Sequence, residues 1–382
     1  MSNKQEILGK NSIFISSPRI AAHKDFFLTK TLSCDMINGR KMHGGNVITQ
    51  AKKYNIEIDK IIDFSANINP LGFPHNLTEL IIKNIKFITN YPDIETSEFK
   101  KALSDYIGIE TKNIIVANGS CELIYLLSNL LSNQSALIPS PTFTEYERAF
   151  KNRVRLVNLT NDDFSLSMDK VIDNIKDAQI VFLCNPNNPT GGLWQKKDIL
   201  KLTKQTMVIV DEAFMDFIEN KESVAKEAAV INNLFVIRSL TKFFAIPGLR
   251  VGYGIGTSKM ISDLEALQPP WSVNSLAQMA GIYVIKDKPF IEETIKLVKK
   301  ERDFLFNSLS QINYLKPYHS FANFILVKLQ SLNSTILTDN LGKQGILIRD
   351  CSNFTFLDNS FIRVAIRTRV ENSKLISELK KI

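Results

Sequence analysis

A lysine with hydroxyl, aromatic and cationic neighbours offers an amine for chemistry on a carbonyl group. Lys242 lies between Thr241 and Phe243, with Ser239 before it and Arg250 eight residues after it. An amine in an apolar pocket near a second positive charge loses its proton more easily, which makes it a nucleophile. A lone lysine is usually a solvated surface group, but this grouping of hydroxyls and a second cation favours a reactive site.

Polar residues also follow two other apolar runs. Gly119 and Ser120 open a predicted helix, where free N–H groups and the positive end of the helix dipole suit a phosphate. A Gly-Ser helix cap without a ligand is the alternative. Two prolines in the segment 185–191 hold a rigid turn that presents Asn188 in a fixed direction, although an ordinary structural turn has the same composition.

Asp211 follows a run of three apolar residues and places a carboxylate at the end of a buried strand. Such a carboxylate is costly unless it meets a cation. It could bind a metal or pair with a protonated ring nitrogen. No cluster of His, Asp and Glu with metal-ligand spacing accompanies it, so we expect no metal and favour the ring nitrogen.

These residues follow short apolar runs that alternate with stretches of helical periodicity, which indicates an α/β fold. Seven runs predict strands, at 114–117, 136–138, 154–159, 180–183, 207–210, 234–238 and 251–255. Several of them are apolar throughout, as expected for strands that are covered on both faces. A long helix is predicted over 275–309, followed by strands at 324–327, 345–349 and 361–366. Ligands of such sheets bind at the carboxyl ends of the strands.

The 382 residues suffice for two domains that share a cleft. We expect a flexible extension at 1–41, an N-terminal part of the small domain at 42–85, a large domain at 86–275 and the rest of a small α/β domain at 276–382. The net charge of +8 comes from scattered residues without a block of five like charges, so a small anionic ligand is favoured over nucleic acid.

The four cysteines form no metal or disulfide pattern, and no apolar run is long enough to span a membrane. The first 35 residues lack the apolar core of a secretory signal. We therefore expect a cytoplasmic protein without a membrane partner.

Together, these motifs resemble the pattern of fold-type I, pyridoxal-phosphate (PLP) enzymes related to aminotransferases. The resemblance runs from about residue 43 to the C-terminus and implies a large domain with a seven-stranded, mainly parallel sheet between helices, plus a smaller α/β domain. It implies that Lys242 forms the Schiff base with the cofactor and that Asp211 pairs with the pyridinium nitrogen, so that the ring acts as an electron sink.

The resemblance also implies further cofactor contacts. The cofactor phosphate would be bound by the helix start and the strand-end hydroxyls, namely Gly119, Ser120, Cys121, Ser239, Thr241 and Arg250. Phe143 would stack on the ring and Asn188 would bind its 3′-oxygen. Tyr91 matches a tyrosine that reaches the cofactor of a neighbouring subunit, which implies a homodimer.

Two branches of this superfamily fit, the threonine-phosphate decarboxylases of cobalamin synthesis and the histidinol-phosphate aminotransferases. Four strings resemble the decarboxylases, at 43–46, 63–72, 270–274 and 361–367. Phe214 stands where aminotransferases commonly carry a tyrosine directed at the cofactor, which points the same way. The resemblance to the decarboxylases implies contacts to a phosphorylated amino acid by His43, Gly44, Asn67, Asn188, Arg349 and Arg363.

The expected reaction is the conversion of O-phospho-L-threonine to (R)-1-aminopropan-2-yl phosphate and CO2. Orientation of the Cα–carboxylate bond perpendicular to the ring would decide that this bond breaks. A histidinol-phosphate aminotransferase and a PLP-fold binding protein without turnover stay open as alternatives. The sequence leaves phosphothreonine and phosphoserine undistinguished, since one methyl group changes binding by only about 1 to 3 kcal/mol.

Overall fold

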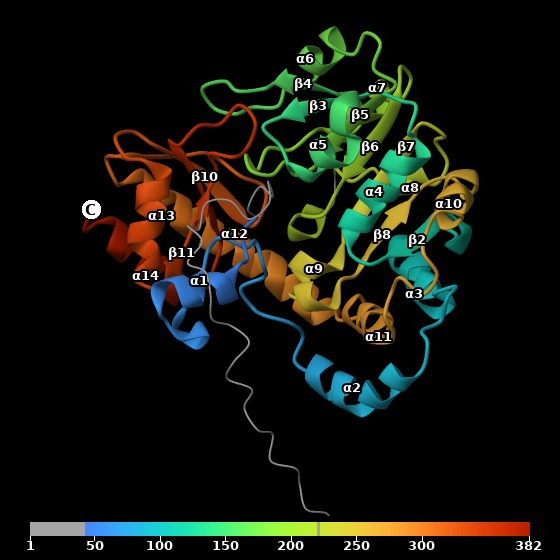
Figure 1. Cartoon of the computed structure of the whole chain (residues 1–382), viewed down its shortest axis with the longest axis horizontal. Helices are drawn as coiled ribbons and strands as arrows, with labels where there is room; N and C mark the ends of the chain where they lie inside the picture. Colours follow the sequence, from blue (N-terminus) through green and yellow to red (C-terminus); the bar gives the residue numbers. More distant parts are fainter. Residues whose placement is uncertain (1–42, 220–221) are drawn as a thin grey trace, which may run out of the picture. The chain divides into compact units, whose positions relative to one another are not determined.

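A seven-stranded sheet forms the centre of the computed structural model, which describes residues 43–219 and 222–382 (Figure 1). Its strand order is β2-β8-β7-β6-β5-β3-β4. The strands are β2 (Ile114–Ala117), β3 (Ala136–Ser140), β4 (Val154–Asn158), β5 (Ile180–Cys184), β6 (Met207–Asp211), β7 (Leu234–Ser239) and β8 (Gly252–Ile255). Neighbouring strands are parallel except for β8, which is antiparallel to β2 and β7. All seven predicted runs and the mainly parallel sheet are confirmed.

Alternation along the strands explains why several of the runs, such as β5, are apolar throughout. In β5, Val181 and Leu183 belong to one buried cluster, while Ile180 and Phe182 belong to another. Because successive side chains of a strand point to opposite faces, both faces must be apolar when helices cover both.

The helices around the large sheet form its two outer layers. Their bounds are α3 (Ser97–Ile107), α4 (Ser120–Leu130), α5 (Glu145–Phe150), α6 (Met168–Asp173), α7 (Lys196–Leu202), α8 (Ala225–Ala228), α9 (Leu240–Phe243) and α10 (Ser258–Glu265). Apolar residues of α4, α5 and α10 pack on one face, and those of α3, α7 and α8 pack on the other. The sheet is therefore sandwiched by helices, as predicted.

A second group of elements forms the smaller α/β part. A four-stranded antiparallel sheet has the order β12-β13-β10-β9, and β1 pairs in parallel with β11. These strands are β1 (Ile62–Asp63), β9 (Leu315–Pro317), β10 (Phe324–Leu329), β11 (Ile346–Leu347), β12 (Arg349–Asp350) and β13 (Phe361–Ala365). The accompanying helices are α1 (Val47–Tyr54), α12 (Lys288–Ser310), α13 (Ser334–Gly342) and α14 (Arg369–Leu379).

Two predicted elements of the C-terminal region are wrong in their extent. The helix predicted over 275–309 is interrupted and forms α11 (Ser275–Val284) and α12, because Asp287 caps α12 by accepting a hydrogen bond from the Phe290 N–H at 3.1 Å. Pro289 fits only within the first turn of a helix. The strand predicted over 345–349 is divided between β11 and β12, which belong to different sheets.

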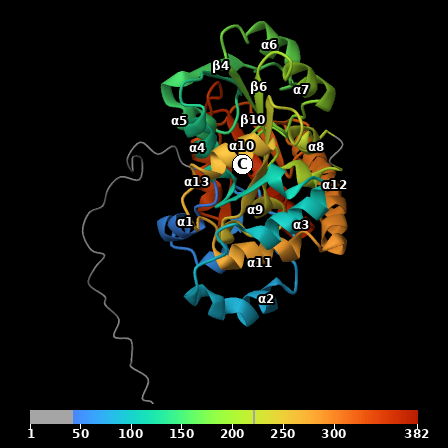
Figure 2. The same ribbon diagram turned by 90° about the vertical axis from the view of Figure 1, so that its right-hand side faces the viewer.

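The helix α2 (Leu77–Asn84) lies beside α11 in both views (Figures 1 and 2). Leu77, Ala277 and Ala280 join the cluster on one face of the large sheet. The domain boundaries at 85/86 and 275/276 stay predictions, and the extension predicted at 1–41 lies outside the described residues. Among the described residues, no helix combines the length and apolar character needed to cross a bilayer.

Candidate active site

The polar residues at the strand ends meet because their strands are neighbours. Asp211 ends β6 and is in register with Cys184 of β5 and Ile237 of β7. The loop with Asn188 follows β5, and Lys242 lies on α9, directly after β7. Since these three strands are parallel, their carboxyl ends lie at one edge of the sheet.

Lys242 is half-buried and lies at the end of a short chain of hydroxyl groups. Its Nζ donates to Thr241 Oγ1 at 2.8 Å, and that oxygen lies 2.7 Å from Ser239 Oγ. Burial lowers the pKa of Lys242, and the positive charges of Arg250 and Arg363 act in the same direction. The amine therefore has the lowered pKa that the sequence predicted.

Asp211 is a buried carboxylate held by two donors. Tyr146 Oη donates to Oδ2 at 2.8 Å and the Ala213 N–H donates to Oδ1 at 3.0 Å. Burial raises the pKa of Asp211, against the effect of these hydrogen bonds, and Asp211 forms no ion pair with another described residue. A protonated ring nitrogen would supply the missing cation, so this position fits the pyridinium of PLP.

Tyr146 is a site residue that the sequence reasoning missed. Its ring is fully buried and stacks on Phe182 at a centroid distance of 4.1 Å. It also meets Phe143 edge-on at 5.6 Å. Its place three residues after the predicted stacking residue was the available signal, but only the fold shows that it reaches Asp211.

Gly119 and Arg250 together form a place for an anion. Gly119 has a φ of +78° and precedes the first turn of α4. A Cβ atom at this position would lie 2.4 Å from Arg250 Nη2, so the guanidinium group lies directly over the glycine. The N–H groups of Ser120 and Cys121 begin the helix and lack intrahelical acceptors. This arrangement fits the cofactor phosphate.

Arg363 is buried and contacts residues from two separate loops. Its Nη1 donates to Asn188 Oδ1, and its Nη2 donates to the Ser65 carbonyl oxygen at 2.8 Å. The guanidinium group lies over the Phe324 ring at 5.2 Å, and Nε has no hydrogen-bond partner among the described residues. Burial lowers the pKa of Arg363 to about 10.

Arg349 lies directly opposite Arg363 in the pairing of β12 with β13. It is also buried, and its Nη2 donates to Asn353 Oδ1 at 2.7 Å. Within 43–219 and 222–382, neither arginine forms an ion pair. Asp350 and Asp63 offset part of these charges without pairing with either guanidinium group. Two adjacent buried cations without an ion-pair partner are costly, so this pair favours an anionic ligand.

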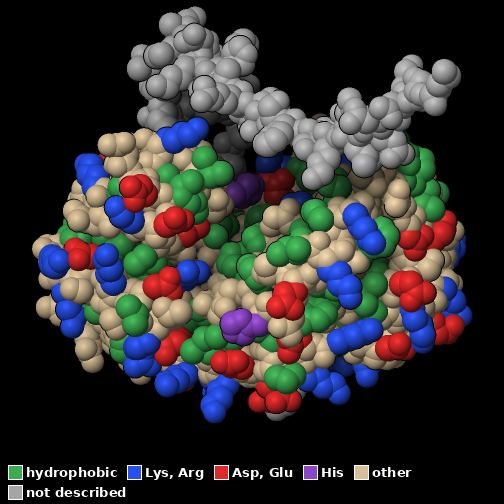
Figure 3. Space-filling model, turned by 90° about the horizontal axis from the view of Figure 1, so that it is seen from below, with side chains coloured by type: hydrophobic (Ala, Val, Ile, Leu, Met, Phe, Trp, Pro, Cys, Tyr) green, Lys and Arg blue, Asp and Glu red, His purple; other side chains and the backbone are tan. Residues whose placement is uncertain are grey.

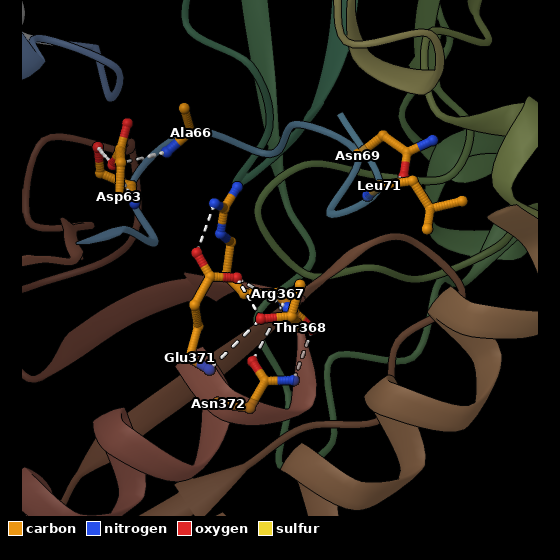
Figure 4. Close-up of polar contacts among 9 residues, drawn as sticks. Asp63, Ala66, Asn69, Leu71, Arg367, Thr368, Glu371 and Asn372 are labelled. Atoms are coloured by element: carbon orange, nitrogen blue, oxygen red, sulfur yellow. Dashed lines mark hydrogen bonds and ion pairs between the residues drawn. The ribbon is translucent and has the colours of Figure 1, made fainter. Parts of the chain in front are cut away.

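The loop after β1 carries the N-terminal half of the site (Figure 4). Asp63 Oδ1 accepts hydrogen bonds from Ser65 N at 2.7 Å and from Ser65 Oγ at 2.6 Å. Ser65 Oγ in turn accepts from the Gly45 N–H at 2.9 Å. A Cβ at Gly44 would lie 2.1 Å from the Ser65 carbonyl oxygen, so no other residue fits this approach.

Two asparagines of this loop point into the protein. Asn67 is buried, and its Oδ1 has no hydrogen-bond partner among the described residues, which leaves it available to a ligand. Asn69 was not predicted as a site residue, but its Nδ2 donates to the Phe243 carbonyl oxygen at 2.6 Å. Its backbone N–H donates to the Lys242 carbonyl oxygen at 3.0 Å. Asn69 thus attaches this loop to the helix of the reactive lysine.

Phe143, His43 and Cys121 also lie near these groups. The Phe143 and His43 rings are 5.6 Å apart, and His43 Nε2 lies 2.7 Å from Glu145 Oε1. Burial raises the pKa of the half-buried Cys121 thiol. The charge of Lys242 lowers this pKa and that of Asp211 raises it.

Tyr91 is not brought into these contacts. Its side chain is 79% exposed, and its ring lies 4.7 Å from that of Trp271. Its predicted contact would be made to a second chain, so its role stays a prediction. Among the described residues, no group of three His, Cys, Asp or Glu side chains could hold a metal.

Comparisons with known proteins show which family the chain belongs to. The model of the family "Aminotransferase class I and II" matches residues 59–379. The chain is 40% identical over 360 residues to the "Putative threonine-phosphate decarboxylase" of Caldanaerobacter subterraneus subsp. tengcongensis, with 90% of this chain and 96% of that protein covered. It is 33% identical to the histidinol-phosphate aminotransferase of Methanococcus aeolicus, with 87% and 92% covered.

A solved structure agrees with the fold as well. The histidinol-phosphate aminotransferase from Clostridium acetobutylicum matches with a TM-score of 0.78 and 35% identity, covering 83% of this chain and 98% of that one. The chain therefore belongs to the aminotransferase class I and II family, and its cofactor is pyridoxal phosphate.

Proposed function

We propose that this protein is a threonine-phosphate decarboxylase of cobalamin synthesis, which converts O-phospho-L-threonine to (R)-1-aminopropan-2-yl phosphate and CO2. The pair of buried arginines, Arg349 and Arg363, carries the proposal. The substrate has two anionic groups, a carboxylate and a phosphate, that can neutralise two adjacent guanidinium groups. The similarity to a protein named as this decarboxylase supports the same substrate.

Different residues of the chain would bind the substrate and transfer the proton. Arg363 would bind the substrate carboxylate while Asn188 and the Ser65 carbonyl hold its guanidinium group in place. Pyridoxal phosphate, when bound, supplies the electron sink for cleavage at Cα. Lys242 Nζ, whose lowered pKa favours the neutral amine, can accept a proton from the substrate's ammonium group and donate it to Cα after CO2 leaves.

Phe214 is the residue at which decarboxylation and transamination are expected to differ. It is buried and packs edge-on against Phe324 at 5.1 Å. A phenylalanine ring donates no hydrogen bond, so Asn188 is left as the predicted partner of the cofactor's 3′-oxygen. This supports a ring environment that differs from that of aminotransferases with a tyrosine here.

The second candidate is a histidinol-phosphate aminotransferase, which the similarity to the Methanococcus aeolicus protein favours. Histidinol phosphate has a phosphate but no carboxylate, so only its amino acceptor would use Arg363. A binding protein without turnover is the third candidate. The proximity of Lys242 to Asp211 and Arg250, which is the arrangement expected of a working PLP enzyme, argues against it.

The deciding experiment gives the purified holoenzyme O-phospho-L-threonine, O-phospho-L-serine, or histidinol phosphate with 2-oxoglutarate. We expect CO2 and aminopropanol phosphate from the first substrate, without any keto acid. Lys242→Ala should abolish the cofactor's lysine-dependent absorption band and CO2 release together. Glutamate formed from histidinol phosphate, without CO2 from phosphothreonine, would overturn the assignment. Substrate binding without any product would favour the binding protein.

We also propose that the chain acts as a homodimer. Tyr91 and Trp271 form an exposed aromatic pair, and Phe87 and Ile88 nearby in the sequence are exposed too. Exposed apolar side chains that form a patch are typical of a protein interface. By contrast, Lys and Arg are interspersed with Asp and Glu on the face drawn in Figure 3, which is consistent with a net charge spread over the surface.

A further inference from the structure

Glu145 is a buried carboxylate next to the predicted substrate site, and none of the roles above uses it. It is the first residue of α5 and is only 7% exposed. Three side chains donate to it: His43 Nε2 at 2.7 Å, Tyr125 Oη at 2.8 Å and Arg148 Nη1 at 2.6 Å. These bonds, that of His43 first, lower the pKa of Glu145 to about 2 although burial acts against them. Glu145 is therefore ionised at neutral pH.

An ionised carboxylate determines which His43 nitrogen is free. Because an ionised carboxylate can only accept hydrogen bonds, His43 Nε2 must carry the proton of this bond. The other nitrogen, Nδ1, has no hydrogen bond to any described residue, and the side chain is 41% exposed. An imidazole paired with a carboxylate through one nitrogen can hold a second proton on the other and donate it to an anion.

The helix α5 also contacts the segment next to Arg349, another residue predicted to contact the phosphorylated substrate. Thr355 Oγ1 donates to Glu147 Oε1 at 2.9 Å. Thr355 lies two residues after Asn353, the hydrogen-bond acceptor of Arg349. One short helix thus contacts both His43 and the segment that binds Arg349. These two side chains, from distant parts of the sequence, are predicted to contact the phosphorylated substrate.

We propose that Glu145 is a positioning residue for the substrate phosphate: it orients His43 so that Nδ1–H donates to a phosphate oxygen. The proposal rests on the proposed function only in requiring a phosphorylated substrate. It does not depend on whether the enzyme decarboxylates or transfers an amino group.

The test is a double-mutant cycle on the holoenzyme with Glu145→Gln and His43→Asn. The measured quantities are KM for O-phospho-L-threonine and the inhibition constant of inorganic phosphate. A charged hydrogen bond contributes enough that each single variant should raise both constants by roughly tenfold, with kcat changed less than about threefold. Because Glu145 acts through His43, the double variant should bind no more weakly than His43→Asn alone.

Glu371→Gln is the matched control. Glu371 is also an ionised, half-buried carboxylate, which caps α14 and pairs with Arg367 (Figure 4). The Glu371→Gln substitution makes the same chemical change as Glu145→Gln, but away from the predicted substrate contacts. It should leave both constants within about twofold, since it alters stability without altering His43.

The outcomes are distinct. Losses that multiply in the double variant, or a phosphate inhibition constant unchanged by Glu145→Gln, would overturn the proposal. If Glu145→Gln fails to retain the cofactor, Glu145→Asp, which keeps the charge, takes its place in the cycle. Its effect on both constants must then disappear in the His43→Asn background. Inorganic phosphate can compete with whichever substrate is turned over, histidinol phosphate included. An enzyme that does not decarboxylate therefore refutes the proposed function and leaves the test of Glu145 intact.

Discussion

Asn69 connects the loop after β1 to the helix that carries Lys242, and its removal should cost a measurable part of the stability. The side chain is 1% exposed. Its Nδ2 donates to the Phe243 carbonyl oxygen at 2.6 Å and to Thr294 Oγ1 at 2.8 Å. Its Oδ1 accepts from the Leu71 N–H at 2.9 Å, and both residues are labelled in Figure 4. Asn69→Ala removes all three bonds. At about 1 kcal/mol for each, the free energy of unfolding should fall by about 3 kcal/mol.

The assay is urea unfolding followed by circular dichroism on the wild type and the variant. Asn174→Ala is the control, because the exposed Asn174 makes one hydrogen bond of the same kind, from Nδ2 to the Lys170 carbonyl oxygen at 2.8 Å. Its effect should stay within about 0.5 kcal/mol. A loss below about 1 kcal/mol for Asn69→Ala would refute the reasoning, since it would show that these buried groups find other partners.

Three further predictions concern the cofactor, pH and assembly. Gly119→Ala should weaken PLP affinity by about tenfold or more, measured by titrating the apoprotein, because its Cβ displaces the Arg250 guanidinium and its φ of +78° is unfavourable for alanine; an unchanged affinity would contradict the predicted phosphate site. The lowered pKa of Glu145 contributes stability above pH 4.5 that is lost as the pH falls toward about 2, so Glu145→Gln should show a flatter stability profile in this range; equal slopes in urea unfolding would contradict it. Light scattering should show a dimer, and a monomeric holoenzyme would contradict this. Tyr91→Ala should weaken PLP binding, because Tyr91 is predicted to reach the cofactor of the second subunit.

The large sheet was predictable because its signal is local. A strand covered on both faces must be apolar along its whole length, as in β5, and this can be seen within five residues. The break before α12 had a local signal too, since Asp287 and Pro289 mark a helix start, but the apolar periodicity continues across it. The division of 345–349 between two sheets had none, because β11 pairs with β1 from a distant part of the chain, whereas β12 pairs with β13.

The amino-acid sequence by itself determined the fold, the family and the residues at the strand ends, among them Lys242 and Asp211. These can be inferred from short segments, because the residue types in each segment indicate whether it is buried and whether it can bind a ligand. Only the tertiary structure decided which groups meet across the site. His43 and Glu145 are 102 residues apart, and Arg363 and Ser65 are 298 apart. Such contacts depend on how separate elements pack and pair, so no local pattern contains them. The pairing of β12 with β13 likewise places two arginines side by side, and this creates the need for an anion.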